Sequence, residues 1–178
     1  MTQSELELKS LVDRIKANDL TAFDEIYRLT RDEVARLLFH LVGDRDDLEA
    51  LVSETYSRLL DAAREMGEQD LLRPVIHALC AKVALRHLGF WGKKSAVAAA
   101  LPGEPADEND AARLLHGALA QLPPKTRVAF VYSELLGLSP DEVAKTMGAS
   151  RRAVGSHLRR ARHDLTHAMR QQDLEVAP

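Results

Sequence analysis

Residues 135–170 have the sequence LLGLSPDEVAKTMGASRRAVGSHLRRARHDLTHAMR, which contains two helix patterns separated by a short turn. The first pattern begins at Ser139, where a proline follows the hydroxyl and Glu142 stands three residues on, as in a capping box. Gly148 ends this helix, and Ser150 can cap the next one after only a few residues. This spacing predicts a helix-turn-helix.

The second helix of the pair has an apolar side and a cationic side. Its apolar residues recur at steps of four and three, which predicts a packing stripe made of Val154, Leu158, Ala161, Leu165 and Ala168. At about 100° per residue, the opposite face and its flank carry Arg151, Arg152, Gly155, Ser156, Arg159, Arg160 and Arg162. A solvated helix face usually interleaves Glu and Asp, but only Asp164 is acidic between Ser150 and Arg170. The pattern therefore favours DNA contact over a merely solvated charged face.

Composition sets the limits of this hypothesis. The chain has 178 residues, enough for one ordinary domain or two small ones, and its apolar share of 46% supports real cores. Its net charge is −3, yet residues 150–178 hold six Lys and Arg against three Asp and Glu. The positive charge is therefore local, and we expect a partner to supply much of the affinity for nucleic acid.

The single cysteine and the distribution of apolar residues indicate a compartment. Cys80 lies within an apolar helical pattern, so a buried thiol is expected and a disulfide framework is excluded. The sequence has no apolar run of membrane-spanning length and no signal-peptide pattern at its start. These features predict a cytoplasmic protein without membrane insertion.

The rest of the chain also shows helical periodicity, with no alternation of period two, so we predict an all-α fold. Helices are expected over 4–17, over 21–43 with Thr21 as the cap, over 44–67, and then up to Trp91. Two more are expected before the helix-turn-helix, over 110–119 and 126–136.

Residues 92–110 mix glycine, proline, alanine and acidic residues without periodicity, which is typical of a flexible linker. The linker would divide the chain into two small helical domains, residues 1–91 and 111–178. One side of the last helix before the linker forms a second basic surface that continues into the linker. Its residues are Arg73, His77, Lys82, Arg86, His87, Lys93 and Lys94.

The C-terminal domain resembles region 4 of the bacterial sigma-70 family of transcription initiation factors, in particular the small extracytoplasmic-function (ECF) group. The resemblance is carried by Leu122-Pro123-Pro124, Gly137-Leu138-Ser139, Asp141 to Ala144, and the residues from Ser150 to Leu165. In that family, region 4 reads the upstream, minus-thirty-five promoter element in the major groove. The resemblance therefore assigns this role to the cationic strip, Arg151, Arg152, Gly155, Ser156, Arg159, Arg160 and Arg162.

The N-terminal half resembles region 2 of the same family in a divergent form. Asp46 to Glu49, Leu51-Val52 and Glu54 to Tyr56 are similar to the helix that binds the polymerase clamp, although Ala50 and Ser53 replace the usual residues. This similarity implies a set of core polymerase-binding residues, namely Asp47, Glu49, Leu51, Ser53 and Glu54.

Arg73-Pro74 and His87-Leu88 are similar to the ends of the family's helix for the downstream, minus-ten element. The resemblance assigns contact with that element to the second basic surface. Val75, Lys82 and Arg86 stand where the family has tryptophan, asparagine and aspartate.

The expected function is that of an initiation factor that binds core RNA polymerase and directs it to promoter DNA, with an anti-sigma factor as a possible partner. Two alternatives remain open: a free-standing helix-turn-helix regulator that needs no polymerase, and a sigma-like domain that titrates an anti-sigma factor. We expect no enzyme and no cofactor, because the sequence has no glycine-rich phosphate loop and no nucleophile elbow. His163 and His167 have the spacing of two metal ligands on a helix, but they lack a third ligand nearby, so no metal is expected.

Overall fold

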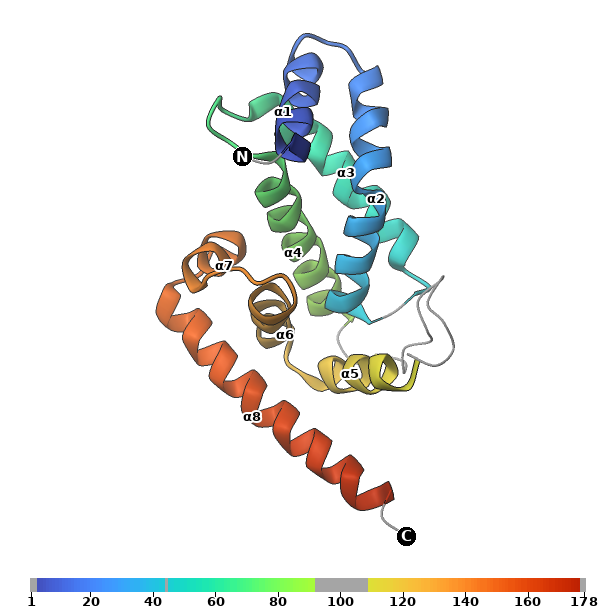
Figure 1. Cartoon of the computed structure of the whole chain (residues 1–178), viewed down its shortest axis with the longest axis vertical. Helices are drawn as coiled ribbons and strands as arrows, with labels where there is room; N and C mark the ends of the chain where they lie inside the picture. Colours follow the sequence, from blue (N-terminus) through green and yellow to red (C-terminus); the bar gives the residue numbers. More distant parts are fainter. Residues whose placement is uncertain (1–2, 44, 92–108, 177–178) are drawn as a thin grey trace.

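The computed structural model describes residues 3–43, 45–91 and 109–176, and every element within these ranges is helical (Figure 1). This confirms the predicted all-α fold. Most of the predicted linker, with Lys93 and Lys94, lies outside the described residues. In chain order the elements are α1 (Gln3–Lys16), α2 (Thr21–Val42), α3 (Leu48–Glu65), α4 (Leu72–Trp91), α5 (Asn109–Gln121), α6 (Pro124–Phe130), the π-helical turn η1 (Val131–Leu135), α7 (Pro140–Met147) and α8 (Arg151–Val176).

Helices α1 to α4 form an N-terminal bundle around an apolar core. Apolar residues three or four positions apart share one face of a helix, and in α1 they are buried: Leu8, Leu11, Val12 and Ile15. Burial of such a stripe stabilises a helix more than its intrinsic propensity does. The bundle is therefore specified by the period of its apolar residues.

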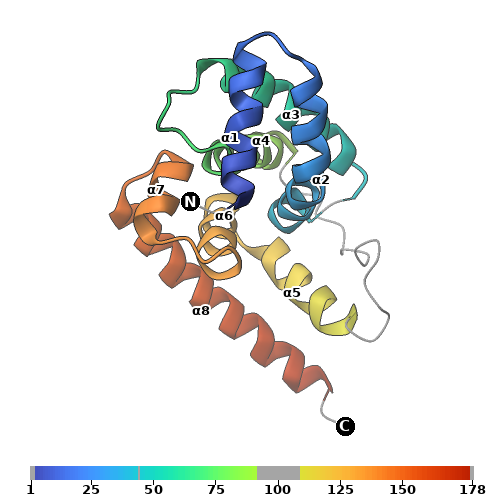
Figure 2. The same cartoon turned by 45° about the horizontal axis from the view of Figure 1, so that its top comes forward.

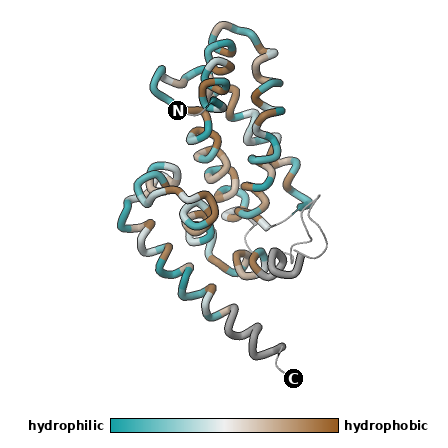
Figure 3. The backbone as a smooth tube through the Cα atoms, viewed as in Figure 1, coloured by the Kyte–Doolittle hydropathy of each residue, from teal (hydrophilic) through white to brown (hydrophobic). Residues whose placement is uncertain are grey.

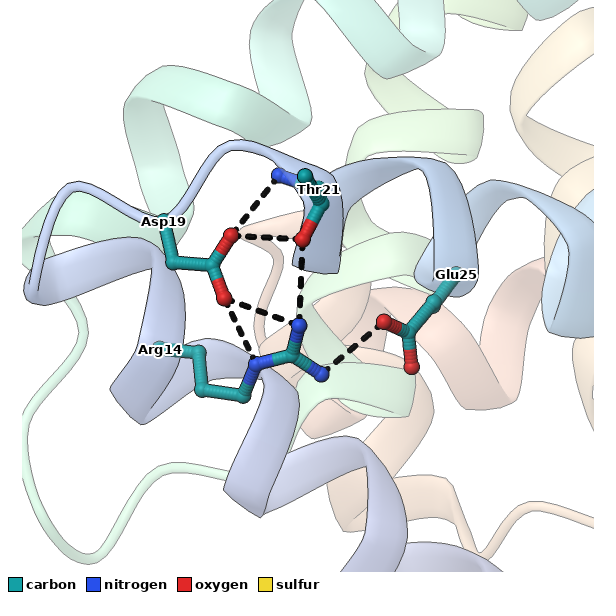
Figure 4. Close-up of polar contacts among 4 residues, drawn as sticks. All are labelled: Arg14, Asp19, Thr21 and Glu25. Atoms are coloured by element: carbon teal, nitrogen blue, oxygen red, sulfur yellow. Dashed lines mark hydrogen bonds and ion pairs between the residues drawn. The ribbon is translucent and has the colours of Figure 1, made fainter.

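The turn between α1 and α2 is fixed by a polar network (Figure 4). Asn18 adopts a φ of 65°, in the left-handed region that asparagine tolerates better than most residues. The Asp19 carboxylate accepts hydrogen bonds from the backbone N–H of Thr21 at 3.0 Å and from its hydroxyl at 2.6 Å. Arg14 donates to Asp19 and to Glu25, each at 2.9 Å. The predicted cap at Thr21 is thus wrong, since Asp19 supplies the acceptor at the start of α2.

Helix α4 packs against elements on more than one side. It contacts α1, α2 and α3 as well as α6 and α7 of the C-terminal half. Ile76, Cys80, Val83 and Ala84 are each at most 1% exposed. In Figure 3 apolar residues follow one another along much of α4, whereas the coloured part of α8 is mostly hydrophilic. A helix that is apolar around most of its circumference must be covered on several faces, so α4 joins the two halves of the molecule.

The C-terminal half comprises α5 to α8 and lies directly against the N-terminal bundle. Helix α6 lies between α8 and the bundle, and α5 packs beside the last turns of α2 (Figure 2). The C-terminal part of α8 extends away from the rest of the molecule (Figure 1). One set of buried residues runs through both halves without interruption. The closed packing brings the helix-turn-helix beside α4.

Candidate DNA-binding surfaces

The helix-turn-helix is formed by α7 and α8 and has the predicted caps. Ser139 and Glu142 make a complete capping box, in which the Glu142 carboxylate accepts from the Ser139 backbone N–H at 2.8 Å. The Ser139 hydroxyl also donates to this carboxylate, at 2.7 Å, and this hydrogen bond, followed by the one from the backbone N–H, holds the pKa of Glu142 below its ordinary value. Gly148 ends α7 with a φ of 59°, and the Ser150 hydroxyl accepts from the Ala153 N–H at 3.2 Å. Local sequence thus determines where α8 begins and in which direction it leaves the turn.

Helix α8 turns its apolar stripe inward and its cationic strip outward. Val154, Leu158, Ala161 and Leu165 are buried, while Ala168 is half-buried. The arginines of the strip and Ser156 are exposed, and Gly155 is half-buried. A Cβ at position 155 would meet only the Arg159 side chain, at 3.7 Å, so packing within the chain does not require glycine there.

The arginines of the strip differ in their partners. Arg151 lies 3.4 Å from Asp141 and Arg160 lies 3.5 Å from Asp164, in exposed pairs of the kind that contribute little to stability. Among the described residues, Arg152 and Arg159 have no carboxylate partner. Both guanidinium groups are therefore available to a phosphate or a guanine edge.

Arg162 instead connects α8 to the turn before the helix-turn-helix. Its guanidinium donates to Glu134 at 2.7 Å. Glu134 belongs to η1, where the Leu136 N–H donates five residues back to the Val131 carbonyl at 3.1 Å. The sequence predicted one regular helix over 126–136 and missed this π-helical turn, which places Glu134 beside α8 while Tyr132 is buried.

The second basic surface, on α4, is largely paired with the protein's own carboxylates. Arg73 forms an ion pair with Glu33, and the His77 ring lies 3.2 Å from the same carboxylate. The hydrogen bond with His77, followed by the charge of Arg73, holds the pKa of Glu33 below its ordinary value. Lys82 is exposed. Much of the positive charge at the start of α4 is therefore already compensated.

The end of α4 is paired with α3. Arg86 forms an ion pair with Glu54, and His87 lies 3.4 Å from Asp47. These acidic residues are two of the predicted polymerase contacts. Of the others, Glu49 and Ser53 are exposed, whereas Leu51 is 5% exposed and packs in the bundle core.

Sequence reasoning missed the residues that join the two halves. Arg127 and Tyr132 on the C-terminal side, with His40 on the other, have partners more than 50 positions away in the sequence. For Arg127 the sequence offered one indication of burial, since this cation directly precedes the apolar pair Val128 and Ala129.

Outside the two basic surfaces, the described residues hold a pocket beside two histidines of α8 and no cluster of metal ligands. In residues 3–43, 45–91 and 109–176, no three His, Cys, Asp or Glu side chains come together as metal ligands. His163 and His167 line a pocket of about 360 Å³ between α5 and α8. None of the described helices combines the length and the apolar character that crossing a membrane requires.

Comparison with known proteins shows what this chain is similar to. Residues 112–165 match the family described as sigma-70, region 4. The ECF RNA polymerase sigma factor SigE of Mycolicibacterium smegmatis is 26% identical over 89% of this chain and 65% of its own length. The probable ECF RNA polymerase sigma factor SigI of Mycobacterium tuberculosis is 28% identical over 80% of this chain and 53% of its own length. The chain thus spans between about half and two thirds of the length of the curated relatives it matches.

Two solved structures share the fold at 18% sequence identity. CnrH, in complex with the cytosolic domain of CnrY, has a TM-score of 0.69 and covers 93% of this chain and 98% of its own. The sigma factor RpoE, in complex with the anti-sigma factor NepR from Bartonella quintana, has a TM-score of 0.68 and covers 83% of this chain and 96% of its own. Residues 112–165 thus match region 4 of the sigma-70 family, and the chain as a whole is similar in sequence to ECF sigma factors and shares its fold with these two structures.

Proposed function

We propose that this protein is a transcription initiation factor that binds core RNA polymerase and directs it to specific promoters. The observation that carries the proposal is the outward cationic strip of α8, set on a capped helix-turn-helix, with Arg152 and Arg159 left without carboxylate partners among the described residues. A recognition helix of this kind enters the major groove, where arginine reads guanine and the flanking residues contact phosphate. The relatives named as RNA polymerase sigma factors support the same function.

Binding to core polymerase is assigned to the N-terminal half of α3. Asp47, Glu49 and Ser53 present polar side chains to solvent there, and Glu54 stands beside them. Leu51 supports this surface from inside the bundle. The protein acts by binding, in the cytoplasm where polymerase is found, and catalyses no reaction itself.

The downstream promoter element is assigned to α4, with Arg73, His77, Lys82, Arg86 and His87. An anti-sigma factor is a further proposed partner, since the neighbour RpoE was solved with one. Such a factor would restrain the same two surfaces that polymerase and promoter require.

Run-off transcription with purified core polymerase, combined with co-elution of the two proteins, tests the function. We expect co-elution and a promoter-dependent transcript. Co-elution without a transcript would indicate the titrating alternative, and tight sequence-specific DNA binding by the chain alone would indicate a free-standing regulator. Arg152→Ala should reduce the transcript, whereas Arg28→Ala, an exposed arginine on α2, serves as the matched control and should not.

A further inference from the structure

His157 lies on α8 at the border between the buried apolar stripe and the cationic strip. Its ring is half-buried, and its Nδ1 lies 3.2 Å from the hydroxyl of Thr126, in the first turn of α6. Helix α6 packs against α8 (Figure 2). Because Arg160 follows three positions later, its side chain and that of His157 are neighbours on the helix surface. The sequence prediction of DNA contacts did not include His157.

The Thr126 hydroxyl can bond to the His157 ring in either protonation state. It donates to a ring nitrogen that carries no hydrogen, or it accepts from one that does. Thr126 itself is 1% exposed, so the surrounding core holds its hydroxyl in place. The other ring nitrogen, Nε2, has no hydrogen-bond partner among the described residues. One nitrogen of the imidazole is therefore available to a ligand.

The charged groups nearest to His157 are cationic. Lys125, on the first turn of α6, is exposed, and the side chain of Arg160 is 64% exposed. Burial, then the charges of Lys125 and Arg160, hold the pKa of His157 below its ordinary value of 6.5. In the described part of the chain, no carboxylate forms an ion pair with His157 or Lys125. The other cationic or imidazole side chains described on the helices packed against α8 bind elsewhere or face solvent, namely Arg127 of α6, Lys145 of α7 and His116 of α5.

The carboxylates around α8 interact with other groups. Asp141 of α7 and Glu134 of η1 pair with arginines at two other places on α8. Glu142 of α7 bonds to the start of its own helix. Asp164 lies 3.5 Å from Arg160, in an exposed pair that contributes little to stability. The Arg160 guanidinium can therefore take a stronger acceptor.

A phosphate group has the chemistry that this cluster lacks. Its negative charge would offset the repulsion that Lys125 and Arg160 exert on a protonated ring, and its oxygens would accept a charge-assisted hydrogen bond from Nε2 of His157. A recognition helix in the major groove has backbone phosphates on both sides, and contacts with them fix its register. His157 follows Ser156 of the cationic strip directly, on the side of α8 that faces α6. Seating the strip in the groove therefore brings this cluster toward the phosphates at the groove edge.

We propose that Lys125, His157 and Arg160 together bind one phosphate of the DNA backbone, and that the imidazole is protonated in this complex. The inference rests on the proposed function, because it takes α8 as the recognition helix. His157 is then a positioning residue for α8, and Lys125 extends the DNA contact from the helix-turn-helix to α6. Binding of DNA is coupled to the uptake of one proton.

The coupling has a definite sign. In the free chain the pKa of His157 lies below 6.5, and a bound phosphate raises it because a nearby negative charge favours the imidazolium. Between the two values the complex holds more protons than the free chain, so the affinity for DNA rises as the pH falls through this window. Well above the bound-state value the contribution of the protonated ring is absent, and below the free-state value it is complete. Each pKa unit between the two values corresponds to about a tenfold gain in affinity.

Fluorescence anisotropy with the full chain and a labelled duplex measures this coupling. A duplex of about 30 base pairs and arbitrary sequence suffices at about 20 mM salt, because phosphate contacts are independent of sequence and strongest at low ionic strength. For the wild-type chain we expect the affinity to rise roughly three- to tenfold from about pH 8 to about pH 6. Lys125→Gln should weaken binding and lower the slope of log affinity against log salt by about 1.

Three substitutions separate the charge of the ring from its packing. His157→Gln is neutral at every pH and can still bond to Thr126, so its binding should be weak and independent of pH. His157→Arg carries a fixed charge, so its affinity at every pH should match that of the wild-type chain in acid. His163→Gln, at an exposed position on the same helix, is the matched control and should keep the wild-type response. Circular dichroism establishes that each variant is folded.

The outcomes distinguish the phosphate site from the proposed function. A pH response that persists in His157→Gln, or that disappears in His163→Gln, would overturn the site. A flat profile in a wild-type chain that still gives a polymerase-dependent transcript would overturn the site alone. A chain that neither binds the duplex nor gives a transcript would refute the proposed function as well. If His157→Arg does not fold, NMR of the wild-type ring decides, because the pKa of His157 must rise when the duplex is added, and an unchanged value would contradict the proposal.

Discussion

Replacing Arg127 with leucine tests whether one buried cation stabilises both halves of the molecule. The substitution keeps the apolar base of the side chain and removes the donors to Leu41 and Val42. Each of these buried carbonyls would lose its hydrogen bond, at about 1–3 kcal/mol apiece. The loss is offset in part because the guanidinium no longer has to be desolvated, a cost that is visible in its lowered pKa and in its Nε, which has no partner. We therefore expect a net loss of about 2–4 kcal/mol.

Urea unfolding followed by circular dichroism measures this loss. Because Arg127 also donates to the Leu122 carbonyl of its own half at 3.4 Å, the C-terminal half should weaken more than the bundle, and the transition should broaden or split. Arg159→Leu is the control, since Arg159 is exposed, and it should change stability by no more than about 0.5 kcal/mol. A loss for Arg127→Leu no larger than that of the control would refute the argument that these hydrogen bonds hold the halves together.

Three further changes address the helix-turn-helix. Arg152→Ala should weaken binding of the polymerase complex to promoter DNA by about 1–3 kcal/mol with unchanged melting temperature, as measured by fluorescence anisotropy. Ser139→Ala removes the capping box and should cost about 1 kcal/mol in thermal unfolding, whereas Ser57→Ala, at an exposed site inside α3, should not be destabilising. Gly155→Ala should stabilise the chain by up to about 1 kcal/mol, because nothing in the chain opposes a Cβ there. If Gly155→Ala also leaves DNA affinity unchanged, close approach of DNA at that position is excluded.

Local features of the fold were predictable from the sequence. Three such features are the capping box at Ser139, the glycine stop at Gly148 and the apolar stripe of α8. Each depends on residues within a few positions of each other, so it can be recognised in the sequence alone. The same is true of α1. The prediction failed at the start of α2, because Asp19, two positions before the predicted cap Thr21, accepts the hydrogen bond from the Thr21 N–H, and only the geometry of the turn shows this.

Features that depend on distant residues were not predictable. The sequence shows basic residues on α4 but not that Glu33 lies beside Arg73 and His77, about 40 positions away. It shows an apolar helix over 126–136 but not the π-helical turn that buries Tyr132. The linker composition predicted two small domains, but it gave no indication that η1 and α4 would share buried contacts across the two halves. Buried polar contacts between the halves require the tertiary arrangement, which periodicity does not encode.

The ion pairs of α4 link the two partners in the proposed function. Glu54 and Asp47, assigned to polymerase, are paired in the isolated chain with Arg86 and His87, assigned to DNA. A polymerase surface that takes the carboxylates leaves the cations without partners, and a phosphate backbone then becomes their best remaining acceptor. Under the proposed function, we therefore expect polymerase binding to raise the affinity of α4 for DNA without any change in the α4 sequence. We expect this linkage to keep a chain with a net charge of −3 from binding DNA indiscriminately while allowing it to bind DNA within the proposed complex.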